Sequence, residues 1–261
     1  MTRRVPALAL VLALAACATT PSPPEPVELT VYAAASLRNA LEQVEAAYEI
    51  AAPGINLVIA TDSSAALRTQ IEQGAPADVF LSADLGNPQQ LYDAGLADGE
   101  ITIFAGNTVV LIVPFDTPAA IRTPADLARD EVRIVAAGDE VPISKYVSNV
   151  VYVLARLAGY PADFSNAYAA NVVSREDNVQ AVVAKIELGE GDAAFVYQTD
   201  ALASGSVRTV PIPDEANVQA HYAGVVMTTS AHPEAARAFL HWLTGPDGRA
   251  ILAEFGFLPP S

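Results

Sequence analysis

Cysteine is almost absent from this chain of 261 residues, in which Cys17 is the only one. An intrachain disulfide is therefore excluded, and the fold must be stabilised by a hydrophobic core. The composition can supply that core, because 52% of the residues are hydrophobic. The length of chain after Cys17 suffices for one large domain or for two smaller lobes.

Long apolar runs are missing as well. No segment beyond residue 17 is long and apolar enough to span a bilayer, which takes about 20 residues. The apolar run over residues 5–16 is shorter than this and follows Arg3 and Arg4. Such a run behind two positive charges is typical of a signal segment that is removed on export.

The end of this run, Leu-Ala-Ala-Cys at residues 14–17, resembles a bacterial lipobox, in which the cysteine is acylated and becomes the new N-terminus. We predict a lipoprotein signal peptide over residues 1–17 and lipidation of Cys17; an ordinary cleaved signal is the alternative. The proline-rich residues 18–26 are predicted to form a semi-rigid tether. We therefore expect an exported protein, periplasmic or at the cell surface, that meets the membrane through its lipid anchor only.

Positive charge is scarce. The chain has 14 Lys and Arg against 30 Asp and Glu, a net charge of −16, which becomes −18 once Arg3 and Arg4 leave with the signal. Such an acidic surface argues against nucleic acid and against an anionic membrane face as partners. It also repels anionic ligands at long range, so a pocket for an anion would have to work through short-range hydrogen-bond donors.

Sequence signatures of catalysis are missing too. The chain contains no Gly-x-Ser-x-Gly, no phosphate-binding loop and no His-Glu-x-x-His. Its three histidines, His221, His232 and His241, show no metal-ligand spacing. Glu176 and Asp177 precede an apolar periodic run, as acidic residues at helix starts commonly do. We expect no enzymatic activity and no cofactor.

Short apolar runs alternate with helical patterns along the chain, which predicts an α/β fold with mainly parallel sheets flanked by helices. Strands are predicted over residues 27–32, 55–60, 79–82, 109–114, 134–136, 193–196 and 207–211. Helices are predicted over residues 37–48, 65–73, 85–94, 146–158, 179–189, 233–243 and 245–255.

The strands form two series, which suggests two lobes. The β-branched apolar runs at residues 108–113 and 222–228 are the expected crossings between them. We therefore predict one lobe from residues 27–107 plus 222–261 and a second lobe from residues 108–221.

Small and hydroxyl-bearing residues recur where a predicted strand ends and a helix begins. They include Ser36 after the first strand, Ser64 after the second, and Asn178 before a later helix. Ligands of α/β folds bind outside the carboxyl ends of strands, where helix N-termini present free N–H groups. These residues therefore suggest an anion site, although Ser36 and Ser64 as simple N-caps remain the alternative.

Several segments resemble the periplasmic molybdate-binding proteins of ABC importers. Residues 30–37 (TVYAAASL) and 70–84 (QIEQGAPADVFLSAD) carry most of the likeness, and it extends through residues 177–179 and 195–201 to the C-terminus. The resemblance implies a two-lobe type II periplasmic binding protein fold with the ligand in the cleft between the lobes. It also implies a monomer that captures molybdate, and tungstate with it, and delivers the anion to a membrane permease.

The resemblance further implies which residues hold the oxyanion. The serine hydroxyls are those of Ser36 and Ser64, the backbone donors those of Ile143 and Val179, and the tyrosine donor is Tyr197. Molybdate is fully deprotonated at neutral pH, so a shell of donors satisfies all its oxygens, whereas an anion that carries a proton is rejected.

This chain departs from the family pattern at Asp62, beside the serine pair, and in the loop before Ile143. Asp62 and Glu176 are therefore also candidates for direct ligands of the metal atom. A different solute, such as sulfate, ferric iron or a sugar acid, is also compatible with the fold, and so is an extracytoplasmic enzyme.

Overall fold

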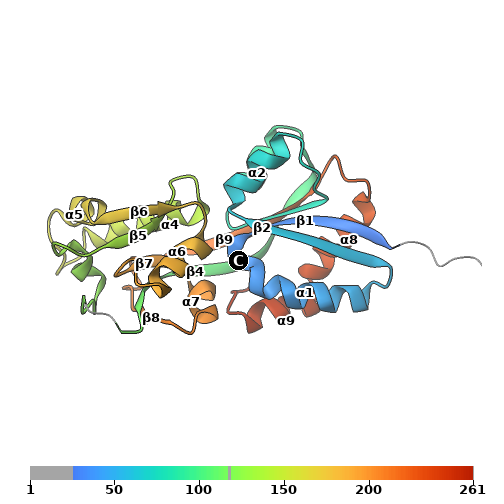
Figure 1. Cartoon of the computed structure of the whole chain (residues 1–261). Helices are drawn as coiled ribbons and strands as arrows, with labels where there is room; N and C mark the ends of the chain where they lie inside the picture. The colour runs from blue at the N-terminus through green and yellow to red at the C-terminus, as the bar shows by residue number, and fades with distance from the viewer. Residues whose placement is uncertain (1–25, 117–118, 261) are drawn as a thin grey trace, which may run out of the picture.

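The computed structural model describes residues 26–116 and 119–260. The predicted signal peptide, Cys17 and the tether up to residue 25 lie outside this part. Figure 1 shows two bodies joined by the long strands β4 (Ala97–Pro114) and β9 (Gln219–Met227). No helix in the described ranges is long and apolar enough to cross a membrane.

The first body is built on three parallel strands. These are β1 (Val27–Ala34), β2 (Ile55–Asp62) and β3 (Val79–Ser82), in the order β2-β1-β3. Its helices, including the short 3-10 helix η1, are η1 (Ala35–Leu37), α1 (Arg38–Ala51), α2 (Ser64–Glu72), α3 (Gly86–Asp93), α8 (Pro233–Leu243) and α9 (Pro246–Glu254).

The second body holds the short parallel pair β5 (Ile134–Ala137) and β6 (Val172–Glu176), together with β7 (Ala194–Tyr197) and β8 (Val207–Val210). Its helices are η2 (Pro124–Ala128), α4 (Pro142–Leu154), α5 (Phe164–Ala170), α6 (Val179–Glu187) and α7 (Gln198–Ala203).

The prediction of mainly parallel sheets holds inside the two bodies and is wrong for the strands between them. β9 runs antiparallel to β3 and β4, and β4 runs antiparallel to β7 and β8. The reason is topological, because a strand that leaves the first body and one that returns to it must run in opposite directions. The sheet is therefore mixed.

β4 is longer than the predicted crossing, since it begins at Ala97. It pairs with β9 as far as Thr108 and with β7 from Val109 onward. Its register with β9 shifts between Asp98 and Thr102, beside Gly99, whose φ of 80° lies in the left-handed region that favours glycine.

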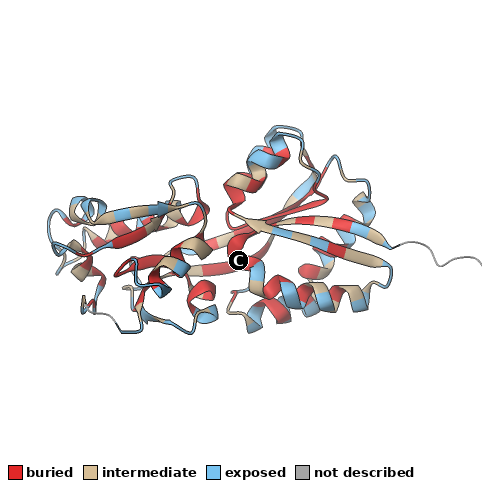
Figure 2. Ribbon diagram, viewed as in Figure 1, coloured by how far each residue is buried: buried red, intermediate tan, exposed pale blue. Residues whose placement is uncertain are grey.

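The core follows the expected periodicities. Along β1, Leu29, Val31 and Ala33 alternate inward and are fully buried. In α1, Leu41, Val44 and Tyr48 lie on the face that covers the sheet. Figure 2 shows buried residues continuing along β4 and β9 from one body into the other. The strand ends that meet between the bodies are thus held by a continuous core.

Candidate oxyanion site

A small cavity lies between the two bodies. Its volume is about 10 Å³, and it is lined by Ala34, Ala35, Ser36, Ser63, Ser64, Ala83, Val141, Pro142, Val179 and Tyr197. The first six come from the ends of β1, β2 and β3 and the helix starts that follow two of them. The other four come from the starts of α4 and α6 and the end of β7. A space of this size holds about one water molecule.

Ser63 and Ser64, at the start of α2, have different hydrogen-bond partners. Ser63 is the N-cap, and its Oγ accepts a hydrogen bond from Ala66 N at 3.3 Å. Ser64 Oγ accepts from Ala83 N at 3.1 Å, which leaves its hydroxyl hydrogen free for the cavity. The interpretation of Ser64 as a simple N-cap is therefore wrong.

Ser36 does not cap a helix either. It lies within η1, whose N-cap is Ala34, and no side chain caps η1 or α1. Its Oγ lies 2.8 Å from Tyr222 Oη on β9. Asn107 on β4 donates through Nδ2 to the same tyrosine oxygen at 3.3 Å. Ser36 thus forms one end of a buried polar chain that reaches the strands between the bodies.

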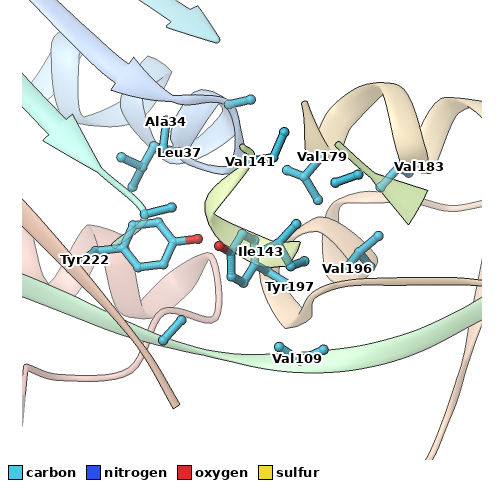
Figure 3. Packing of buried hydrophobic residues seen from close by; sticks show 14 of the residues in the cluster. Ala34, Leu37, Val109, Val141, Ile143, Val179, Val183, Val196, Tyr197 and Tyr222 are labelled. Carbon is cyan, nitrogen blue, oxygen red and sulfur yellow. The ribbon is translucent and has the colours of Figure 1, made fainter. Parts of the chain in front are cut away.

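Tyr197, at the end of β7, brings a phenol to the cavity. Its Oη is buried, and within the described residues only it and His221 Nδ1 are buried side-chain polar atoms without a hydrogen-bond partner. Burial, together with nearby Tyr222, Tyr146 and acidic groups, raises the pKa of Tyr197 well above its usual range. The phenol therefore keeps its proton and remains a donor. Figure 3 shows Tyr197 beside Tyr222, Val141 and Val179.

The starts of α6 and α4 supply backbone to the cavity wall. Val179 is the first residue of α6, whose N-cap Asn178 accepts from Ala181 N at 3.1 Å through Oδ1. Val141 is the N-cap of α4 and Pro142 its first residue. The start of α6 presents the free N–H groups and partial positive charge that favour an anion. At the start of α4, Pro142 has no N–H and Val141 N donates to Gly138 O at 3.0 Å, so the next N–H of that helix is that of Ile143.

Charged side chains do not line the cavity. Asp62 Oδ1 accepts from Asn178 Nδ2 of the second body at 3.1 Å and from the neighbouring Ser63 N at 2.7 Å. Glu176 pairs with Lys185 at 3.0 Å. Neither carboxylate lines the cavity.

Asp200 lies behind Tyr197 and also stays out of the cavity. It accepts from Tyr197 N at 3.2 Å and from Gln180 Nε2 at 2.7 Å. Burial raises the pKa of Asp200 to about 7, and these two hydrogen bonds oppose the shift. At neutral pH this buried carboxyl is therefore protonated in part of the molecules, which limits its repulsion of an anion.

The two bodies touch on the rim of the cavity. Besides the Asp62–Asn178 contact, Lys145 Nζ lies 3.4 Å from Asp84 Oδ2. Tyr146 Oη donates to Ala83 O at 3.4 Å. Burial raises the pKa of Tyr146 to about 12, so this hydroxyl also remains a donor. The two bodies are thus in direct contact beside the cavity.

The family model of the bacterial extracellular solute-binding proteins matches residues 29–258, which is most of the chain. The chain belongs to this family. A relative, the molybdate-binding protein ModA of Mycobacterium tuberculosis (strain H37Rv), is 34% identical over 96% of this chain and 95% of its own length. A putative ABC transporter substrate-binding lipoprotein of Bacillus subtilis, YvgL, is 31% identical over 97% of this chain and 96% of its own.

The fold of this solute-binding protein has solved counterparts. The periplasmic molybdate-binding protein of Azotobacter vinelandii matches it with a TM-score of 0.76 at 23% identity, covering 89% of this chain and 100% of that one. This match supports the type II periplasmic binding protein fold. A more distant relative, an aconitate isomerase from a Pseudomonas species, is 26% identical over 98% of this chain and 97% of its own.

In this solute-binding protein, four of the five residues predicted to bind the oxyanion line the cavity between the bodies: Ser36, Ser64, Val179 and Tyr197. Ile143 does not line it; its side chain is buried and lines a separate cavity of about 370 Å³ in the second body. Its immediate neighbours Val141 and Pro142 line the oxyanion cavity instead. The binding roles of all five stay predictions.

Sequence reasoning missed Tyr222 and Asn107. Tyr222 opens the predicted crossing run 222–228, and Asn107 directly precedes the run 108–113, within β4. Each is polar and fully buried in such a strand. A polar residue inside a crossing strand is the signal that could have identified them, because buried polar groups need partners.

Proposed function

We propose that this protein is the extracytoplasmic binding component of an ABC importer, and that it captures molybdate and also tungstate. One observation carries the proposal: an uncharged cavity between the bodies brings together two serine hydroxyls, the N-terminus of α6 at Val179 and the buried, unpartnered Tyr197 hydroxyl. Each of these groups can donate a hydrogen bond. A fully deprotonated oxyanion needs such a shell, because leaving water is costly unless donors replace the lost ones.

The molybdate-binding relatives support molybdate as the solute, and tungstate follows from its equal charge and similar size. Sulfate meets the same donors but has shorter bonds to oxygen, so its exclusion would come from the size of the cavity. We propose a two-lobe clamp in which the rim contacts hold the closed form, and this closed form docks on the permease. The proposed lobes are residues 27–107 plus 222–261 and residues 108–221, supported by the change of β4 pairing after Thr108.

Thermal unfolding with added oxyanions tests the solute. A ligand that binds only the native state stabilises it by mass action, by about 2.7 kcal/mol at 100 times Kd. For a chain of this length that raises Tm by roughly 5–10 °C. Molybdate and tungstate should each give this shift at micromolar concentration, and equal sulfate should give little. If neither metal oxyanion moves Tm, the proposal is wrong; a shift with sulfate alone would identify a sulfate-binding protein.

We also propose that binding is the whole task, without catalysis, and that Cys17 carries a lipid. No titratable side chain with a pKa in the neutral range lines the cavity, which supports binding without catalysis. The Bacillus relative described as a lipoprotein supports lipidation of Cys17. Incubation of the purified protein with aconitate should leave that compound unchanged. Mass spectrometry of the mature N-terminus should find an acylated Cys17, and Cys17→Ala should release the protein from the membrane.

A further inference from the structure

The hydroxyl of Ser36 can either donate to the cavity or accept from it, and only donation suits an anion. Two side chains outside the cavity lining settle the direction. Tyr222 Oη lies 2.8 Å from Ser36 Oγ, and Asn107 Nδ2 lies 3.3 Å from the same Tyr222 oxygen. Tyr222 and Asn107 are both fully buried, so water cannot replace either partner.

The chain of hydrogen bonds starts at the Asn107 amide. Its Oδ1 accepts from Thr108 N at 2.9 Å, which fixes the oxygen on that side. Its Nδ2 therefore faces the other way and donates to Thr199 Oγ1 at 2.9 Å as well as to Tyr222 Oη. An amide NH₂ can only donate, so the Tyr222 oxygen acts as an acceptor toward Asn107.

The Tyr222 hydroxyl has one hydrogen, which needs an acceptor. Ser36 Oγ is the other hydrogen-bond partner of its oxygen within the described residues. If Ser36 donated to Tyr222 instead, the tyrosine hydrogen would be left buried without an acceptor, which is costly. Tyr222 therefore donates to Ser36, and the Ser36 hydrogen is left free for another acceptor. Ser36 lines the oxyanion cavity and also a neighbouring groove of about 470 Å³, and of the two only the cavity is proposed to hold an anion.

We propose that Asn107 and Tyr222 are positioning residues that fix the Ser36 hydroxyl as a hydrogen-bond donor toward the oxyanion. This inference rests on the proposed function and deepens it. Neither residue lines the cavity. The Tyr222 ring also packs on Tyr197, with ring centroids 5.6 Å apart, but its hydroxyl acts through Ser36. The consequence is selectivity, because a locked donor offers nothing to the hydrogen of a protonated anion and favours fully deprotonated ones.

A double-mutant cycle on the full mature chain, titrated with sodium molybdate by calorimetry, tests the proposal. Tyr222→Phe keeps the ring and removes the hydroxyl, and we expect about tenfold weaker binding. In a Ser36→Ala background the same substitution should change binding by less than about twofold, because its effect passes through Ser36. A tenfold loss in both backgrounds would mean a general structural role, and no loss in either would also overturn the proposal.

Thr199→Val is the matched control. Thr199 accepts the other hydrogen of Asn107 in the same buried cluster but stands outside the chain that leads to Ser36. It also lines the neighbouring groove of about 470 Å³. Molybdate binding should stay within about twofold, whatever the change in Tm. A loss equal to that of Tyr222→Phe would count against a directed chain.

Neutron diffraction of ligand-free protein in D₂O tests the hydrogen positions without any anion. The deuterium of Tyr222 should lie on the line to Ser36 Oγ, and that of Ser36 should point into the cavity. A Ser36 deuterium directed at Tyr222 would overturn the inference even if molybdate binds. Conversely, wild-type protein that fails to bind molybdate would overturn the proposed function and leave the neutron result to decide the hydrogen-bond direction.

Discussion

The Tyr197 hydroxyl lies buried at the cavity wall without a hydrogen-bond partner among the described residues. A buried donor in this state costs about 1–3 kcal/mol of stability. The neighbouring serine hydroxyls differ, because Ser64 accepts from Ala83 N and Ser36 contacts Tyr222. Among the side chains that line the cavity, Tyr197 is thus the one that would gain most from a hydrogen bond to a bound anion.

Tyr197→Phe should therefore move stability and binding in opposite directions. We expect the ligand-free protein to gain about 1 kcal/mol in free energy of unfolding, since the unpaired hydroxyl is gone. Molybdate binding should weaken about tenfold or more, since one donor is lost. Urea unfolding and calorimetry measure the two effects.

Tyr92→Phe on α3 serves as the control, because Tyr92 is half exposed and away from the cavity. It should leave both quantities unchanged. A loss of stability in Tyr197→Phe would mean that its hydroxyl is paired in the folded protein, and would contradict this account of the site.

The sequence could predict the positions of these hydroxyls but not all of their partners. Small residues at a strand end before a helix are a local pattern, which is why Ser36 and Ser64 were identifiable. The sequence could not show that Ser63 takes the cap and Ser64 faces the cavity. Tyr222 lies 186 residues from Ser36, so their contact exists only after the crossing strands have assembled.

The N-terminal ends of helices shape the site, and most of the positions at which helices begin were predictable from the sequence. α1, α2, α3, α6, α8 and α9 begin within a residue or so of the predicted positions. α4 begins at Pro142, before the predicted residue 146, because proline is favoured in a first helical turn. β6, α5 and α7 were missed; β6 is never fully buried and mixes polar with apolar residues, so it lacks a clear strand pattern.

The start of α6 also carries a contact between the bodies, which Asn178→Asp tests. An aspartate keeps the N-cap of α6, yet it replaces the donor to Asp62 by a second carboxylate. Repulsion between them should disfavour the closed form and weaken molybdate binding by roughly tenfold at low salt, less at high salt.

The double variant Asp62→Asn with Asn178→Asp restores a donor and an acceptor across the same gap at unchanged net charge. It should regain most of the lost affinity in calorimetry. If the double variant binds no better than Asn178→Asp alone, the contact between the bodies does not contribute to closure.

At the scale of the whole molecule, a net charge of −16 surrounds a cavity proposed for an anion. The cavity lining is uncharged, so its donors act only at short range. An approaching anion therefore meets repulsion from the surface before it meets any donor. Opposite charges on a protein and its ligand usually speed association at low salt. Here the protein surface and the ligand have the same sign of charge, so the surface charge slows association at low salt.

Raising the ionic strength should accordingly speed the association of molybdate. The Debye length falls from about 30 Å at 0.01 M to about 8 Å at 0.15 M salt, which screens the surface carboxylates from the anion. We expect the association rate constant to rise several-fold over this range in stopped-flow fluorescence. The dissociation rate should change little, because the short contacts inside a closed cavity are screened far less. Sucrose at equal osmolality controls for solvent effects, and an association rate that falls with salt would require a positive entrance to the cleft.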